Sequence, residues 1–417
     1  MSASEAKPSA APVLELLNAF RASASLLTAV SLGVFECLAS APSGLSAEDL
    51  AKAVATRNAG GTTAGSDVSC DGLERLCRAC TSLDLLHSPS PGSYALTPVS
   101  ATYLVSSSPD SLTGYCFHSQ QVVWPLFGGN GLAAAVQTGS HVWQQQFGGT
   151  SADIFSRIYA TPPDVLRFMR GMHAFAQLSA AAVVKAFDLG WVRSMVDLGG
   201  ATGAIARAAC EAYPGLQSAV VVDLPHVVAT VTQHFADVPC TGAHGQGAAG
   251  EGEAAGEGEA AGEGEAAGEG GAGAAAEGAA AAVGGGPPGT SCGGRVRWLA
   301  ADFFGEAERL PQQVDLVVLS RILHDWDPPR CAQVLKVAHG LLRPGGCVLV
   351  AEMLLHEDRL GPTPALLQDL NMLVQTHGRE RSPSEYAALL EGAGFEGVQA
   401  ARTGTYLDAV LGRKPGP

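Results

Sequence analysis

Between residues 194 and 351 the chain alternates short runs rich in Val, Leu and Ala with segments long enough to form helices. Apolar runs of this length, without polar alternation, are typical of strands that are buried on both faces of a parallel sheet. The intervening helices then cover the sheet on both sides. The pattern therefore predicts an α/β fold built on apolar runs at residues 194–198, 219–223, 295–300, 314–320 and 347–351.

The first part of the chain has a different, mostly helical pattern. Apolar residues recur at helical spacing along residues 12–38 and again along residues 71–87, and Ser46 is a candidate N-cap for a helix between them. A turn rich in Pro, Gly and Ser follows, and then the short run Tyr94–Pro98. Three helices and a short hairpin are the outline of a winged-helix module. Because no basic recognition face is evident, we interpret it as a dimerisation unit rather than a DNA-binding one.

We expect two domains, a helical N-terminal dimerisation domain over residues 1–185 and an α/β domain over residues 186–417. The second is interrupted at about residues 241–294 by a tract that repeats AAGEGE and has almost no apolar side chain larger than Ala. Such a composition cannot bury enough surface to offset the entropy of ordering it. We predict a disordered Gly/Ala/Glu-rich insertion between the second and third strands. A sheet tolerates this because loop-closure entropy grows slowly with loop length.

Charge and hydropathy exclude several classes of partner. The formal net charge of −15 argues against nucleic acid, because phosphate binding needs clustered Lys and Arg. The N-terminus lacks a basic segment followed by an apolar one, and no uninterrupted apolar run approaches the roughly 20 residues of a membrane-spanning helix. We therefore expect a cytoplasmic protein that binds neither nucleic acid nor membranes.

The first predicted strand ends in the sequence VDLGGATG, residues 196–203. Its glycines, Gly199, Gly200 and Gly203, let the chain turn sharply and bring backbone close to a ligand at the start of the next helix. In open α/β sheets, ligands bind outside the carboxyl ends of the strands. The spacing differs from the GxGxxG of dinucleotide-binding folds, which argues against a nicotinamide cofactor.

Acidic residues follow the next two predicted strands. Asp223 closes the second strand at a position where a carboxylate can accept hydrogen bonds from ribose hydroxyls, and it could also cap the helix that begins at Pro225. Asp302, Phe303 and Phe304 follow the third strand. There a carboxylate could accept from an adenine amino group while an aromatic ring covers the base. In this order, behind a glycine turn, these residues support a site for an adenosine-containing ligand.

The motifs DLGGATG, VVDLP, ADFF, SRILHDW, LLRPGGCVLVAE and LNMLVQTHGRERS occur in this order. With them, the chain resembles the small-molecule, cation-independent O-methyltransferases of plants and animals from about residue 12 to 412, apart from the insertion. The resemblance implies a Rossmann-like class I methyltransferase domain and a helical, winged-helix-like N-terminal domain that interlocks in a homodimer. It also implies S-adenosylmethionine as methyl donor, S-adenosylhomocysteine as product, and a 5-hydroxyindole amide as the small aromatic acceptor.

Matched by motif, the resemblance also implies roles for individual residues. His324 would be the base, and acceptor contacts would come from Asp325, Asn371 and Gln375. The chain has Ala201 where the family usually has a third glycine, and Ala176 where an aromatic residue is expected. These departures concern the tightness of donor binding more than the identity of the donor. Donor contacts would come from Tyr159, Asp223, Asp302, Phe303 and Arg321.

His324 follows the fourth predicted strand, at the sheet edge where ligands bind. An aromatic hydroxyl with a pKa of about 10 is mostly protonated at neutral pH and a weak nucleophile, and a histidine beside it can accept the proton as the new bond forms. Glu352 and Glu380 are candidates to fix the tautomer and orientation of the imidazole, as glutamates at both matching positions do in the wider family. The alternative for His324 is a packing role next to Trp326.

Asn371 and Gln375 are four residues apart on an apolar helix and hence on one face, where they contact the acceptor or bond a neighbouring helix. No metal-ligating constellation is evident. The His324-Asp325 pair lacks the further carboxylates of a Mg²⁺-dependent catechol methyltransferase. The remaining scattered histidines show no ligand spacing, so we expect metal-independent catalysis; they include His173, His339, His356 and His377.

Two alternative functions stay open at this level. The first is methylation of another small phenol, such as a flavonoid or a catechol-like acceptor, because acceptor choice depends on pocket walls that motifs do not reveal. The second, from a different class, is a non-catalytic homologue that serves as a dimeric binding or scaffold protein. Loss of the base would mark that case, whereas His324, Glu352 and Glu380 are all present. A nicotinamide-dependent dehydrogenase fits less well than either.

Overall fold

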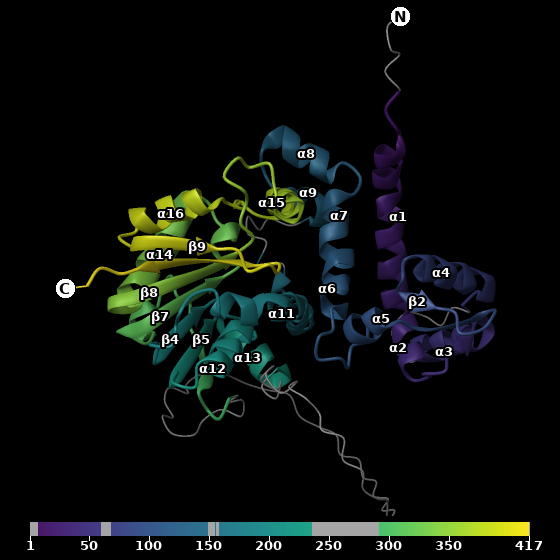
Figure 1. The fold of residues 1–417 in the computed structure, drawn as a ribbon, viewed down its shortest axis with the longest axis horizontal. Helices are drawn as coiled ribbons and strands as arrows, with labels where there is room; N and C mark the ends of the chain where they lie inside the picture. Colours follow the sequence, from purple (N-terminus) through teal and green to yellow (C-terminus); the bar gives the residue numbers. More distant parts are fainter. Residues whose placement is uncertain (1–6, 60–67, 149–154, 156–157, 236–291, 417) are drawn as a thin grey trace, which may run out of the picture.

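The computed structural model describes residues 7–59, 68–148, 155, 158–235 and 292–416. Figure 1 shows an α/β body formed by the later part of the chain, and a helical N-terminal part to one side of it. The tract that we predict to be a disordered insertion lies outside the described residues, except for its last three positions, 292–294.

The α/β body is built on a seven-stranded sheet with the order β6-β5-β4-β7-β8-β10-β9. The first five of these strands are parallel, and they include all five predicted runs. The last two were not predicted: β10 runs antiparallel to both β8 and β9, so the sheet is mixed. The strands are β4 (Ser194–Leu198), β5 (Ser218–Asp223), β6 (Val296–Ala300), β7 (Val314–Ser320), β8 (Leu342–Glu352), β9 (Glu396–Ala401) and β10 (Asp408–Arg413).

Both faces of the sheet are buried, as the uninterrupted apolar runs predict. Neighbouring strand residues belong to different hydrophobic clusters: Met195 packs on one face and Val196 on the other. The first face is covered by α11 (Pro162–Val184), α12 (Ala204–Ala212) and α13 (Pro225–His234), and the second by α14 (Pro328–Leu341) and α16 (Pro383–Gly392). Two clusters of apolar side chains, one on each side, therefore hold the strand ends in place.

The N-terminal part has the predicted helices followed by a hairpin, and one further short strand that was not predicted lies between its second and third helices. Its three short strands form an antiparallel sheet in the order β1-β3-β2. A separate core that includes Phe35, Leu50 and Cys77 holds these elements together. The elements are α1 (Ala11–Leu32), α2 (Val34–Ala39), β1 (Leu45–Ser46), α3 (Ala47–Ala59), α4 (Cys70–Ser82), β2 (Leu86–His87), β3 (Ser93–Leu96) and α5 (Pro98–Tyr103).

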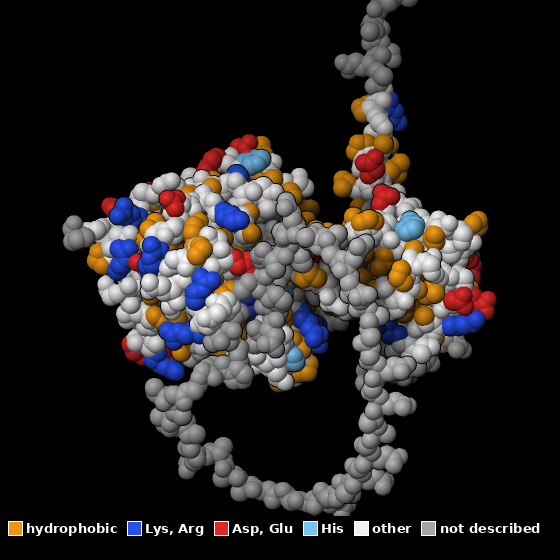
Figure 2. All heavy atoms as spheres, turned by 60° about the horizontal axis from the view of Figure 1, so that its bottom comes forward, with side chains coloured by type: hydrophobic (Ala, Val, Ile, Leu, Met, Phe, Trp, Pro, Cys, Tyr) orange, Lys and Arg blue, Asp and Glu red, His pale blue; other side chains and the backbone are white. Residues whose placement is uncertain are grey.

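The first half of α1 carries an apolar surface that the rest of the described chain leaves uncovered. Val13, Leu14, Leu16, Leu17 and Phe20 are all more than half exposed, and Figure 2 shows hydrophobic side chains along this projecting helix. By length and composition, α1 is the one described helix that could cross a membrane. Contiguous exposed apolar side chains mark an interaction surface, and a partner that covers them would remove them from water.

Short helices connect the N-terminal part to the α/β body. They are α6 (Thr113–His118), the π-helical turn η1 (Ser119–Val123), α7 (Trp124–Phe127), α8 (Gly131–Thr138) and α9 (Trp143–Phe147). The long helix α11 contacts both α6 and α12, and its Met169 and Val183 are part of the core on the first face of the sheet. On the other side, Leu126 of α7 and Ala135 of α8 pack against Val374 of α15 (Thr363–Gln375).

Candidate active site

The carboxyl ends of the parallel strands open into a cavity of about 350 Å³. This is the edge at which ligands bind in open α/β sheets. The cavity is lined by eleven of the fourteen predicted site residues, namely Tyr159, Gly199, Gly200, Asp223, Asp302, Phe303, Arg321, His324, Asp325, Asn371 and Gln375. The other three, Gly203, Glu352 and Glu380, lie behind this wall.

The glycine turn after β4 has the backbone that its sequence predicts. Gly199 and Gly203 have φ angles of 68° and 73°, in the left-handed region that favours glycine. A Cβ on Gly200 would come within 2.4 Å of the Asp197 carboxyl carbon. Gly203 is the N-cap of α12, and a Cβ there would meet the ring of Trp298 at 3.0 Å. These glycines therefore allow close packing of the turn, and Gly199 and Gly200 also form cavity wall.

Asp223 fastens the glycine turn to the end of β5. One carboxylate oxygen accepts from the backbone N–H of Ala201 at 3.0 Å, and the other accepts from the N–H of Leu224 at 2.8 Å. Leu224, not Asp223, is the N-cap residue of α13, so the alternative of an Asp223 N-cap is wrong. Burial raises the pKa of the Asp223 carboxyl to about 6. Its carboxylate stays at the cavity wall, where its remaining lone pairs can accept from a ligand.

Asp197 is a site residue that the sequence analysis did not select, because it lies inside an apolar strand run. Its side chain is buried and lines the cavity. Neither carboxylate oxygen makes a hydrogen bond of ordinary geometry among the described residues, although the backbone N–H of Ala206 lies near enough to lower its pKa. Burial, and then the nearby charge of Asp223, raise the pKa of Asp197 to about 7. A buried carboxyl without partners is costly unless a bound group satisfies it. The available signal was an acid two residues before the first glycine of the turn.

Arg321 offers the opposite charge in the same cavity. Its Nε and Nη1 atoms are buried and have no acceptor among the described residues, while its guanidinium carbon lies 4.4 Å from the centroid of the Phe175 ring. Guanidinium groups bind carboxylates through two such donors. Together, Asp197 offers carboxylate oxygens and Arg321 offers two free N–H donors, which suit the ammonium and carboxylate of an amino-acid group.

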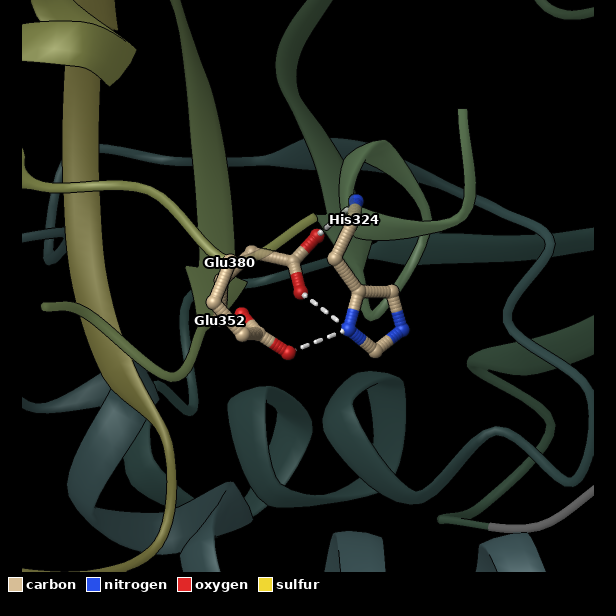
Figure 3. Close-up of side chains that lie close together, drawn as sticks. All are labelled: His324, Glu352 and Glu380. Atoms are coloured by element: carbon tan, nitrogen blue, oxygen red, sulfur yellow. Dashed lines mark hydrogen bonds and ion pairs between the residues drawn. The ribbon is translucent and has the colours of Figure 1, made fainter. Parts of the chain in front are cut away.

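His324 lies in the 3₁₀ turn η3 (Leu323–Asp325) and is buried next to two glutamates. Figure 3 shows both carboxylates on the Nδ1 side of its ring. The Nδ1 atom lies 2.8 Å from Oε1 of Glu380 and 3.5 Å from Oε2 of Glu352, which ends β8. The Oε1 atom of Glu352 accepts from the backbone N–H groups of residues 322–324 at 3.0–3.3 Å. The imidazole is therefore held from one side, and its Nε2 atom is left for the cavity.

Burial alone lowers the pKa of His324, because it disfavours the charged imidazole. The carboxylates of Glu352, Glu380 and Asp325 outweigh burial and raise the pKa of His324 to about 9. Burial also raises the pKa of Glu352, to about 7, although the nearby imidazolium opposes this. The arrangement thus binds a proton firmly, at a place where one ring nitrogen faces a ligand cavity.

Three residues that the sequence analysis did not select hold the turn that carries His324. Arg381 donates to the carbonyl oxygens of Leu323 and Trp326, both at 2.9 Å, and the Cys331 thiol donates to the Leu323 carbonyl at 3.2 Å. Gly378 packs so closely that a Cβ there would lie 1.9 Å from the backbone oxygen of His324. Their spacing in sequence gives no signal of this role.

The predicted acceptor residues form one face of α15. The side chain of Gln375 donates to Asn371 Oδ1, and Asn371 donates to Gln368 Oε1 at 3.4 Å. The amides therefore bond within α15 and face the cavity. Helix α6 also contributes His118 to the cavity wall, a lining residue that the sequence analysis missed. Burial, and then the charge of Arg321, lower the pKa of His118 to about 4, so its imidazole is neutral at physiological pH.

The two departures from the family pattern lie at or beside the cavity. Ala201 has a φ of 48°, in the left-handed region where a glycine would fit without strain. Ala176 lines the cavity, while Phe175 packs against Arg321 instead. Aromatic side chains also gather at this cavity: Phe303 and Phe304 lie with ring centroids 4.7 Å apart, and the ring of Tyr159 contacts that of His226.

Comparisons with known proteins agree with this geometry. An O-methyltransferase domain model matches residues 130–247 and 289–396, and an O-methyltransferase dimerisation domain model matches residues 14–106. The chain belongs to the O-methyltransferase family. The resemblance stated from its motifs, the fold class and the assignment as an O-methyltransferase are thereby confirmed.

Within that family, several of the similar proteins are named acetylserotonin O-methyltransferase. Acetylserotonin O-methyltransferase of Bos taurus is 36% identical over 403 residues, which are 96% of this chain and 96% of that protein. The Homo sapiens protein of the same name is 32% identical over 400 residues, 95% of each chain. The crystal structure of human N-acetylserotonin methyltransferase in complex with SAM has a TM-score of 0.77 and 31% sequence identity, and the match covers 99% of this chain and 100% of that one.

Proposed function

We propose that this chain transfers a methyl group from S-adenosylmethionine to the 5-hydroxyl of N-acetylserotonin, giving melatonin and S-adenosylhomocysteine, with His324 as the general base. The observation that carries the proposal is the buried imidazole of His324, which is held through Nδ1 by Glu380 and lies in the same cavity wall as the glycine turn. Relatives of nearly the same length that are named acetylserotonin O-methyltransferases support the choice of acceptor.

The residues in the cavity fit S-adenosylmethionine. Arg321 and Asp197, which have unsatisfied buried donors and acceptors, match its carboxylate and ammonium groups. Asp223 can accept from the ribose hydroxyls, while Asp302, Phe303 and Tyr159 can hold the adenine. When bound, the donor supplies an electrophilic methyl group on a sulfonium. Everything else in the reaction depends on side chains of this chain and on the acceptor.

His324 supplies the proton acceptor. The acceptor hydroxyl is a weak nucleophile until its proton leaves, and His324 Nε2 takes that proton as the oxygen–carbon bond forms. With a pKa of about 9, the imidazole of the ligand-free site is protonated at neutral pH. A cation bound in the same cavity disfavours this protonated form through like-charge repulsion. Glu380 and Glu352 then stabilise the imidazolium that forms during the reaction.

The acceptor is held on the α15 side of the cavity. Asn371 and Gln375 offer amide donors and acceptors that suit the acetamide group of N-acetylserotonin, and Asp325, whose Oδ1 lies 3.7 Å from His324 Nε2, suits a contact next to the reacting hydroxyl. Placing the oxygen near the methyl carbon converts the reaction into an effectively intramolecular one.

The match to a dimerisation domain supports a homodimer. A second copy would cover the exposed apolar side chains of α1. We also propose that the reaction takes place in the cytoplasm, which cell fractionation with an antibody to the chain would test.

The decisive experiment separates donor binding from turnover. S-adenosylhomocysteine binding is measured by calorimetry for the wild type and for His324→Ala, and turnover with labelled donor is measured on N-acetylserotonin, a flavonoid and a catechol. We expect the variant to bind S-adenosylhomocysteine normally but to lose activity by about 10²- to 10⁴-fold. A higher kcat/KM for the flavonoid than for N-acetylserotonin would overturn the assignment of the acceptor. An active His324→Ala enzyme would overturn the assignment of His324 as the base.

A further inference from the structure

Two histidines that are 236 residues apart in sequence meet at the protein surface. The Nε2 atoms of His141 and His377 are 3.2 Å apart, and the ring centroids are 4.5 Å apart with an angle of 71° between the ring planes. His141 lies in the turn between α8 and α9, and His377 follows the end of α15. His377 is exposed and His141 is half-buried, so solvent can reach the pair.

Backbone contacts hold the two segments that carry these histidines next to each other. The N–H of Val142, next to His141, donates to the carbonyl of Val374 at 3.2 Å. The side chains of Val142 and Val374 are buried in the same cluster as Leu126. After α15, the N–H of Gly378 donates to Thr376 Oγ1 at 3.1 Å, which sets the direction of the chain on either side of His377. The two imidazoles are thus presented to each other by packed segments.

We propose that His141 and His377 form a site for a divalent transition-metal ion, with Zn²⁺, Cu²⁺ or Ni²⁺ as the chemical class. Zinc binds imidazole nitrogen at about 2.0–2.1 Å, and a tetrahedral angle between two such bonds sets the nitrogens roughly 3.3 Å apart. The observed Nε2–Nε2 separation is 3.2 Å. Water completes the coordination on the exposed side. Imidazole suits zinc, copper and nickel, whereas Mg²⁺ and Ca²⁺ prefer oxygen ligands.

The ion would tie the connecting helices to the end of α15. Neither histidine lines the active-site cavity, so catalysis does not require the metal. The ion nevertheless acts close to the catalytic turn, because Gly378, adjacent to His377, packs against the backbone of His324. A bound metal ion would stabilise the folded chain, because the two imidazoles lie next to each other in the folded state and not in the unfolded one.

The experiment must distinguish metal binding at the His141–His377 pair from metal binding at a second cluster of possible ligands. His324, Glu352 and Glu380 also offer ligand atoms that lie within 4.8 Å of one another, but they are buried. Zn²⁺ binding to the metal-free, full-length protein is therefore measured by calorimetry for the wild type, His141→Ala, His377→Ala and His324→Ala. His356→Ala serves as a matched control, since His356 is an exposed histidine outside both clusters.

We expect about one Zn²⁺ per wild-type chain, with binding retained in His324→Ala and His356→Ala and weakened at least tenfold in both His141→Ala and His377→Ala. Saturating Zn²⁺, but not Mg²⁺, raises the thermal midpoint of the wild type by several degrees and leaves that of the two variants unchanged. His377→Asn keeps a side chain that can form hydrogen bonds but removes the imidazole, so this variant should also bind Zn²⁺ more weakly. Midpoints measured with a chelator show whether each variant is folded.

The proposal is overturned if the wild type binds no Zn²⁺, which would make the contact an imidazole–imidazole hydrogen bond only. It is equally overturned if binding survives in folded His141→Ala and His377→Ala, or if His324→Ala abolishes it. The last result would assign the ion to the catalytic cluster.

Discussion

His324 Nδ1 lies 2.8 Å from Oε1 of Glu380, and both side chains are buried. One nitrogen of the imidazole is thereby committed to a carboxylate, which fixes the tautomer that leaves Nε2 able to accept a proton. The chemistry we propose depends on this contact and on the charge of the carboxylate.

Glu380→Gln keeps a hydrogen-bonding side chain but removes a charge that raises the pKa of His324. We expect kcat to fall by about tenfold to hundredfold, because the imidazolium formed in the reaction loses a stabilising charge. S-adenosylhomocysteine affinity should stay the same, since Glu380 does not line the cavity. Glu308→Gln, at an exposed position, is the control. Unchanged kcat in Glu380→Gln would contradict a positioning role.

The pH dependence of kcat/KM follows from the pKa of His324, which is raised to about 9. Only the neutral imidazole accepts a proton, so the protonated form that dominates below this pKa is inactive. We expect kcat/KM to rise with pH and to level off at about pH 9. In Glu380→Gln the rising limb should move to lower pH. A profile that is flat between neutral pH and this value would argue against His324 as the base.

Arg321→Leu removes the unpaired guanidinium from the cavity. We expect S-adenosylhomocysteine binding to weaken by about 10- to 100-fold, the loss of a charged hydrogen-bonding pair. A ligand analogue without the carboxylate should bind the wild type and Arg321→Leu equally well. Calorimetry with both ligands checks this, and an equal loss for both would place the carboxylate elsewhere. Arg309→Leu, whose partner Glu306 lies on the surface, is the control.

Ala201→Gly should stabilise the protein, because Ala201 has a φ of 48° and pays a steric cost that glycine avoids. We expect the free energy of unfolding to rise by about 1 kcal/mol and donor binding to tighten. Ala212→Gly, at the end of α12, should instead lower the free energy of unfolding, since a glycine within a helix costs about 0.5–1 kcal/mol. Denaturant unfolding of both variants measures the difference.

Methyl transfer should not need a metal ion. Treatment with a chelator is expected to leave kcat unchanged, although it would remove an ion from the His141–His377 pair. Activity assays before and after dialysis against the chelator test this, and loss of activity that added Zn²⁺ or Mg²⁺ restores would contradict metal-independent catalysis.

Local patterns in the sequence were sufficient for most of the fold. The run Val314–Ser320 forms β7 with the predicted bounds, because a strand buried on both faces leaves a continuous apolar signal. The glycine turn and the helix after it were likewise readable, since both depend on neighbouring residues. Strand β9 was missed because most of its residues are exposed at an edge of the sheet, where that signal is absent.

The motif resemblance selected His324, Glu352 and Glu380, but only the tertiary structure decided how they interact. Distances such as that between His324 Nδ1 and Glu380 depend on how β8 and the segment after α15 pack together, which no local pattern encodes. The same holds for Asp197, whose importance comes from its burial in the cavity wall, and for His141 and His377, which chain folding brings together across 236 residues. Sequence determines elements through short-range periodicity, whereas charge, burial and long-range contact arise only when those elements pack.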